Sequence, residues 1–234
     1  MLGRAAAGIV GGGAHDLPML DAVLPLECGG CGTPGLRWCG SCAAQLVVAS
    51  DQPRVASPRL DPQIPVFALG RYAGARRQAI IAVKERGRSD LVAPLAAALG
   101  AAVHRLLCWH IVDLPLTIIP APTRAAAARR RGGDPVARIA QRALAGHHDV
   151  TMAPVLRMRA WTRDSVGLGG DARQRNIAGR VVLRRRGLSE LSGPPGDVVI
   201  VDDVMTTGAT LAESVRVLRD AGIPVSTALV IASV

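Results

Sequence analysis

Residues 198–213 read VVIVDDVMTTGATLAE, and this stretch decides the fold. Its first four residues are apolar and mostly β-branched, which is typical of a strand buried on both faces of a parallel sheet. Asp202 and Asp203 follow at the carboxyl end of this predicted strand, where open α/β sheets bind their ligands. A helix is predicted directly afterwards, over residues 209–222. The stretch therefore predicts a strand, a ligand-binding loop and a helix in succession.

Small polar residues fill the loop 206–210, which reads TTGAT. Backbone N–H groups at a helix N-terminus bind anions, and neighbouring hydroxyl groups add donors. Gly208 lets the backbone approach an anion closely because it has no Cβ. The aspartates suit sugar hydroxyls or Mg²⁺, so the whole stretch suits a ribose 5-phosphate. A helix capped by threonine, beside a solvated aspartate pair, is the alternative interpretation.

Strand-like and helix-like segments alternate from about residue 64 onward. Helical periodicity covers residues 76–87 and 90–107, with Asp90 as the expected cap of the second helix. Asp134 and Pro135 predict another helix start, an N-cap followed by proline at the first helical position. The other predicted strands cover residues 66–72, 116–122, 153–158, 179–184 and 224–233. This alternation predicts an α/β fold with a Rossmann-like, mostly parallel sheet.

Four cysteines form two CxxC pairs, Cys28-x2-Cys31 and Cys39-x2-Cys42. In a reducing compartment this spacing favours metal binding over disulfides, and four thiolates suit a structural, tetrahedral Zn²⁺. Gly32 suits the tight turn after the first pair. Free or redox-active thiols are the alternative.

Four segments follow from these patterns. We predict a disordered extension over residues 1–18 and a four-cysteine zinc module over 19–48. Residues 49–63 are proline-rich and aperiodic, which indicates a linker. The α/β domain covers residues 64–234.

The segment VVIVDDVMTTGAT, residues 198–210, resembles the thirteen-residue PRPP-binding motif of type I phosphoribosyltransferases. The order of the other segments is similar to the ComF family of competence-associated, amidophosphoribosyltransferase-like proteins. These segments are the four-cysteine module, GRYAGARRQAIIAVKERG from residue 70, IIPAPTRAAAARRRGG from 118 and DARQRNIAG from 171. The resemblance covers residues 19–234 and implies a type I phosphoribosyltransferase fold.

The resemblance also implies roles for individual residues. Asp202 and Asp203 would hold the 2′- and 3′-hydroxyls of PRPP, supplied with Mg²⁺. Its 5′-phosphate would bind to Thr206, Thr207, Gly208, Ala209 and Thr210. The pyrophosphate loop would comprise Pro120, Ala121, Pro122, Arg124 and Arg131, and a flexible loop would carry Arg173, Arg175 and Asn176. Gly133 and Asp134 stand where the family usually has phenylalanine and asparagine.

Several basic residues admit two interpretations. The cluster of Arg129, Arg130 and Arg131 suits a diphosphate, because guanidinium groups bind phosphate oxygens bidentately, or forms a solvated basic face. Lys84 is the only lysine among 28 basic residues. It either contacts pyrophosphate or is a solvated surface residue.

Two functions from different classes fit these features. One is a phosphoribosyltransferase that releases pyrophosphate, or a PRPP-binding regulator without chemistry. The other is a protein that handles single-stranded DNA, because the net charge is +10. Aromatic residues are only 2% of the chain, which argues against this function because single-strand binders stack bases on aromatic side chains. If the protein does bind single strands, Trp38 and Trp161 are the expected stacking platforms.

The hydropathy pattern predicts a cytoplasmic protein outside the membrane. No apolar run is expected to reach the roughly 18 residues that span a bilayer. The N-terminus is interrupted by glycines and makes a poor signal peptide.

Overall fold

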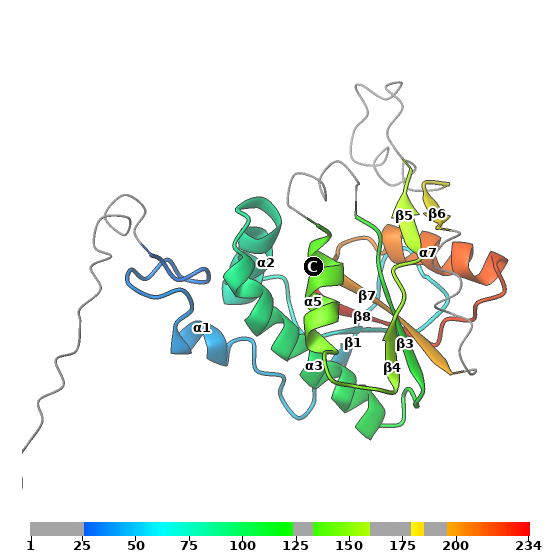
Figure 1. Cartoon of the computed structure of the whole chain (residues 1–234), viewed down its shortest axis with the longest axis horizontal. Helices are drawn as coiled ribbons and strands as arrows, with labels where there is room; N and C mark the ends of the chain where they lie inside the picture. Colours follow the sequence, from blue (N-terminus) through cyan, green and yellow to red (C-terminus); the bar gives the residue numbers. More distant parts are fainter. Residues whose placement is uncertain (1–25, 124–132, 160–178, 185–195) are drawn as a thin grey trace, which may run out of the picture.

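A computed structural model of the chain describes residues 26–123, 133–159, 179–184 and 196–234 (Figure 1). Within these residues, six strands form one sheet in the order β1-β2-β8-β7-β3-β4. The strands are β1 (Arg54–Val55), β2 (Val66–Ala68), β3 (Leu116–Pro120), β4 (Val150–Met152), β7 (Asp197–Met205) and β8 (Thr227–Ser233). Strand β1 is antiparallel to β2, and the other neighbours pair in parallel. The predicted α/β class with a mostly parallel sheet is therefore confirmed.

Helices cover both faces of the sheet (Figure 1). One face carries α2 (Gly74–Glu85), the 3₁₀ turn η1 (Ser89–Leu91), α3 (Val92–Cys108) and α5 (Pro135–Ala143). The other face carries α7 (Ala209–Asp220). Along β7, Val199 and Val201 pack toward the first layer, whereas Val198 and Ile200 pack toward α7. This alternation follows from the two-residue period of a strand, and it explains why the run is apolar throughout.

The predicted helix starts had different outcomes. Asp134 is the N-cap of α5, and its carboxylate accepts hydrogen bonds from the backbone N–H groups of Val136 and Ala137. Asp90 is not a cap, so that prediction was wrong. Its carboxylate instead accepts two hydrogen bonds from Arg88, at 2.8 and 2.7 Å. A nearby guanidinium competes for the same oxygens that a cap would use.

The expectation that no apolar run reaches about 18 residues was wrong. Residues Ser89–Cys108 are long and apolar enough to cross a membrane, and a window of 18 residues within them has a mean hydropathy of 1.7. Half of that window is buried inside the protein. Leu95, Leu99 and Leu106 are almost fully buried in the core. The segment is therefore the core helix of the first layer.

Residues 49–63, predicted as a linker, contact the domain closely. They include β1, which pairs with β2. The N–H of Leu60 donates a hydrogen bond to the carbonyl oxygen of Thr207, at 2.9 Å. The segment thus reaches the loop where the sequence predicts phosphate binding.

The four-cysteine segment, with the short helix α1 (Gly40–Ala44), is held against the α/β domain. Arg88 donates to the carbonyl oxygens of Glu27 and Arg37, at 3.1 and 3.2 Å. The side-chain oxygen of Gln45 accepts from the N–H of Ala75, at the start of α2. The module is therefore tied to the turn that follows α2 and to the start of α2 itself.

Candidate functional site

Strand β7 places the two aspartates on opposite faces. The strand continues through both residues to Met205, beyond the predicted end of the apolar run. Asp202 shares its face with Ile200 and lines a small cavity with the loop 206–210. Asp203 shares its face with Val201 and pairs with Lys84 of α2. The structure thus gives the two carboxylates different surroundings.

Asp202 is half-buried at the strand end. One carboxylate oxygen accepts a hydrogen bond from the N–H of Asp203, at 2.8 Å. Burial raises the pKa of Asp202 well above its usual range, and the neighbouring charge of Asp203 raises it further. A ligand hydroxyl or cation that contacted this carboxylate would stabilise its ionised form.

Asp203 forms an ion pair with Lys84. The lysine Nζ lies 2.8 Å from Oδ2 of Asp203 and donates a hydrogen bond to Oδ1 at 3.0 Å. The Asp203 side chain is 5% exposed and that of Lys84 is 30% exposed. Neither expectation for Lys84, a solvated surface residue or a pyrophosphate contact, included this pairing. Lys84 therefore lies at the candidate site, on the face opposite to Asp202.

The loop 206–210 forms a cavity of about 40 Å³ at the N-terminus of α7. Gly208 is the helix N-cap, with a left-handed backbone of φ 85°. Within the described residues, the side-chain oxygen of Thr207 is a distant acceptor for the N–H of Ala209, at 3.4 Å. A hydroxyl-capped helix is therefore a poor description of this end. The cavity instead combines helix N–H groups with the Asp202 carboxylate, which suits a phosphate next to a sugar hydroxyl.

A close contact with residues 58–60 also requires glycine at position 208. A Cβ at this position would lie 2.5 Å from Cβ of Pro58 and 2.7 Å from the carbonyl oxygen of Leu60. The close approach of residues 58–60 to the loop is thus possible only without a side chain at position 208.

Substituting Gly208→Ala is expected to destabilise the fold by about 1–3 kcal/mol, because it combines a strained left-handed φ with a backbone clash. Urea unfolding measures this change, and Gly222→Ala is the matched control. Gly222 also has a positive φ, of 77°, but a Cβ there would contact nothing within 4 Å. Equal losses in both variants would contradict a role for the Pro58–Leu60 contact.

The predicted pyrophosphate loop begins directly beside Asp202. Pro120 pairs with Val201 in the β3–β7 register, and the N–H of Ala121 donates to the carbonyl oxygen of Val201 at 2.8 Å. Pro120, Ala121 and Pro122 are buried. Arg124 and the cluster Arg129–Arg131 lie outside the described residues. The structure thus brings the start of this segment to the strand that carries both aspartates.

Asp134 holds the far end of the same segment. Its carboxylate caps α5 and also accepts a hydrogen bond from the hydroxyl of Thr123. Thr123 and Asp134 flank residues 124–132, so this hydrogen bond joins the two ends of the segment. The carboxylate at position 134 supplies the acceptor that this contact needs.

The predicted flexible loop is flanked by a two-stranded antiparallel hairpin. Strands β5 (Leu156–Met158) and β6 (Val181–Leu183) lie within two predicted strand segments, and they pair with each other. Arg173, Arg175 and Asn176 lie outside the described residues. The N–H of Gly179 donates to the carboxylate of Glu213 on α7, at 2.7 Å. Glu213 is buried and also pairs with Arg216, at 2.8 Å. The helix after the TTGAT loop thus anchors the hairpin.

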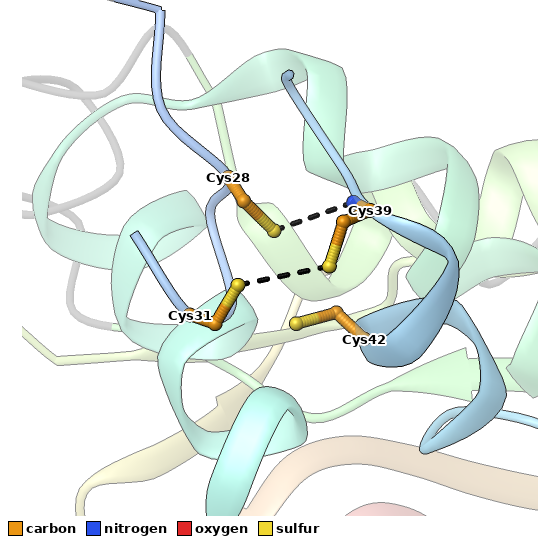
Figure 2. Close-up of side chains that lie close together, drawn as sticks. All are labelled: Cys28, Cys31, Cys39 and Cys42. Atoms are coloured by element: carbon orange, nitrogen blue, oxygen red, sulfur yellow. Dashed lines mark hydrogen bonds between the residues drawn. The ribbon is translucent and has the colours of Figure 1, made fainter. Parts of the chain in front are cut away.

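The four cysteines form one cluster (Figure 2). Their sulfur atoms lie within 4.8 Å of one another, and those of Cys31 and Cys39 are 3.6 Å apart. Four Zn–S bonds of about 2.3 Å in a tetrahedron require sulfur separations of about 3.8 Å. The cluster therefore fits a zinc ion. Cys28 and Cys42 are buried, Cys39 is half-buried and Cys31 is exposed.

The backbone around the first cysteine pair favours the thiolate form of Cys28, which is the form that binds a metal. Burial alone would raise the pKa of Cys28, but hydrogen bonds from the backbone of Cys31, Gly30 and Cys39 lower it to about 6. Burial and the neighbouring thiols raise the pKa of Cys42. Gly32 has a φ of 79°, as its predicted turn requires. Gly30 is equally constrained, because a Cβ there would lie 2.5 Å from Sγ of Cys42.

The sequence did not predict the surroundings of Lys84, Glu213 and Trp38. The pairing of Lys84 with Asp203 spans 119 residues, and no local pattern signals it. Glu213 reads as an ordinary helix-surface residue, although its burial makes it an anchor. Trp38 was expected to be an exposed stacking platform, but it is half-buried and packs against the core. Trp161 lies outside the described residues.

Comparison with known proteins supports the phosphoribosyltransferase type of fold. No family model matches the chain. A stretch of 46 residues, 19% of the chain, is 54% identical to an orotate phosphoribosyltransferase from Aeropyrum pernix. The match spans a quarter of that relative's length. The chain is an α/β protein with partial homology to a phosphoribosyltransferase.

Proposed function

We propose that the protein binds PRPP and transfers its phosphoribosyl group to an acceptor, with release of pyrophosphate. The observation that carries this proposal is the cavity of the loop 206–210, which has the Asp202 carboxylate in its lining. A phosphate and a sugar hydroxyl that belong to one molecule match these two neighbouring features. The partial homology to a phosphoribosyltransferase supports the same ligand class.

Each part of PRPP has a partner in this proposal. The loop 206–210 holds the 5′-phosphate, and Asp202 accepts a hydrogen bond from a ribose hydroxyl. Asp203, oriented by Lys84, is the second carboxylate. Pro120–Pro122 begin the segment toward which pyrophosphate leaves, because Pro120 and Ala121 both contact Val201 of β7, the residue before Asp202. Mg²⁺ bound with PRPP would neutralise part of the diphosphate charge.

Positioning and electrostatics supply most of the catalysis in this proposal. A cavity that fixes the phosphate and the ribose limits the motion of C1 relative to an incoming nucleophile. Carboxylates near the ribose stabilise the positive charge that develops as pyrophosphate departs. A PRPP-binding regulator would use the same contacts without the transfer step.

The cysteine cluster and the segment order extend the proposal. We infer a structural zinc, because four thiolates leave no open coordination position for catalysis. Membership of the ComF family fits the order of the segments, and a cytosolic location fits a site of four thiolates, which a reducing compartment preserves.

Calorimetric titration with Mg²⁺·PRPP tests the proposed ligand. Wild type is expected to bind, and the double variant Asp202→Asn/Asp203→Asn is expected to lose most of this affinity. Ribose 5-phosphate serves as the probe that lacks the diphosphate, and it should bind more weakly. Absence of binding by the zinc-loaded wild type would reject the proposal.

A further inference from the structure

A second cavity lies at the carboxyl edge of the sheet. Its volume is about 330 Å³, and Gly70, Met205 and Ser233 line it at the ends of β2, β7 and β8. It shares Met205 with the lining of the loop cavity, but Asp202, Asp203 and residues 206–210 do not line it. The two cavities are therefore neighbours that share one residue.

The lining of this cavity is strongly basic. Three arginines contribute to it, Arg54, Arg71 and Arg76, and no aspartate or glutamate does. Arg54 is exposed and pairs with Asp51, outside the lining. Arg71 is also exposed. Because Asp51 already pairs with Arg54, the positive charge of this wall rests mainly on Arg71 and Arg76, and it attracts an anion.

Arg76 is the unusual member, because its side chain is buried. The residue is 9% exposed, and its Nε has no hydrogen-bond partner. Its one described hydrogen bond runs from Nη2 to the carbonyl oxygen of Gln45, at 3.2 Å. No carboxylate of the described residues lies within ion-pair distance of it. Burial lowers the pKa of Arg76, but a guanidinium remains protonated at neutral pH.

The position of Arg76 is unusual in two further respects. It is the third residue of α2, and a cation in the first turn of a helix opposes the helix dipole. Its guanidinium also needs Gly70, because a Cβ there would lie 2.4 Å from Nη1 of Arg76. Burial without a counter-charge is unfavourable for any ion. A bound anion would offset the cost of burying this positive charge at a helix N-terminus.

We propose that this cavity binds a small anionic molecule through a carboxylate or phosphate group held by Arg76. Arg54 and Arg71 add positive charge at the exposed side of the cavity. The cavity volume admits a small metabolite and exceeds that of the loop cavity, which is about 40 Å³. The proposal does not rest on PRPP binding, because the two sites use different side chains.

Calorimetric titrations with succinate, inorganic phosphate and pyrophosphate, at constant ionic strength, test this site. At least one of these anions is expected to bind wild type, and Arg76→Gln should weaken that binding about 10–100-fold, as for the loss of a charged hydrogen bond. Succinate identifies a carboxylate site, and the two phosphates identify a phosphate site. The matched control is Arg77→Gln, which removes an exposed charge one residue away on α2.

Two further variants separate the possible outcomes. Gly70→Ala retains the arginine but displaces its guanidinium, so it should reproduce the loss and decides the test if Arg76→Gln does not fold. Phosphate also fits the loop 206–210, and binding there would survive Arg76→Gln, because it uses the N–H groups of that loop. Failure of PRPP binding would leave the Arg76-dependent binding intact. The absence of any Arg76-dependent binding, for all three anions, would overturn the proposal.

Discussion

Chelation of the native protein is expected to release one zinc ion per chain and to lower its thermal stability sharply. The four sulfur atoms lie within 4.8 Å of one another, and two of the cysteines are buried. Without a metal, the Cys28 thiolate has no cation beside it, and the link between the two cysteine pairs is lost. Structural zinc sites contribute on the order of 10 kcal/mol to the folding of small zinc domains.

The loss should extend beyond the cysteine module. Gln45 ties this module to the start of α2, and Arg88 ties it to the turn that follows α2. Lys84, which holds Asp203, lies near the end of the same helix. We therefore expect loosening of the module to reach the start of α2 and to weaken ligand binding at the sheet.

Two cysteine variants provide the comparison for this prediction. Cys42→Ser removes a buried member of the cluster and should lower the zinc content, measured by atomic absorption, to well below one ion per chain. Cys108→Ser removes an exposed thiol outside the cluster and should leave zinc content and melting temperature unchanged. A zinc-free native protein with four thiols open to titration would contradict the account.

Asp202 and Asp203 are expected to respond in opposite ways to neutralisation. Asp202→Asn should maintain or raise the melting temperature at pH 7. Burial raises the pKa of Asp202, so the folded state holds its proton more tightly than the unfolded state does. Its ionisation therefore costs stability as pH rises from about 4 through the raised pKa, and the asparagine variant avoids this cost.

Asp203→Asn should instead destabilise the protein by about 1–3 kcal/mol, because it leaves Lys84 without its buried counter-charge. Each substitution is nevertheless expected to weaken Mg²⁺·PRPP binding about 10–100-fold, the value of one hydrogen bond to a charged group.

Urea unfolding and calorimetry together measure these effects. Asp220→Asn is the matched control, because Asp220 is an exposed aspartate at the far end of α7. Equal stability changes for Asp202→Asn and Asp203→Asn would contradict the assignment of the two carboxylates to different surroundings.

Much of the fold could be predicted because the local patterns and the packing agree. The run before Asp202 is apolar on both faces, and β7 is indeed covered on both sides. The start of α5 could also be predicted, because an aspartate cap followed by a proline marks it. Strand β4 was missed because Val150–Met152 is only three residues long and partly exposed. It forms because β3 provides a parallel edge, which no local pattern encodes.

The candidate site was only partly predictable for the same reason. The aspartates, the TTGAT loop and the cysteine pairs are contiguous, so their spacing identifies them. Lys84, Arg76 and Pro58 reach the site or its neighbourhood from distant parts of the chain. For Asp90 the local pattern predicted a helix cap that does not form, because the carboxylate accepts hydrogen bonds from Arg88 instead. Contacts between distant residues depend on tertiary packing, which periodicity does not describe.

The most direct test of the central claim is a crystal structure of the zinc-loaded protein with Mg²⁺·PRPP. We predict electron density for the 5′-phosphate in the cavity of residues 206–210, with a ribose hydroxyl within hydrogen-bonding distance of the Asp202 carboxylate. The diphosphate should extend toward Pro120–Pro122. Density for PRPP in the cavity of Arg76, or an empty loop in crystals grown with saturating PRPP, would contradict the account.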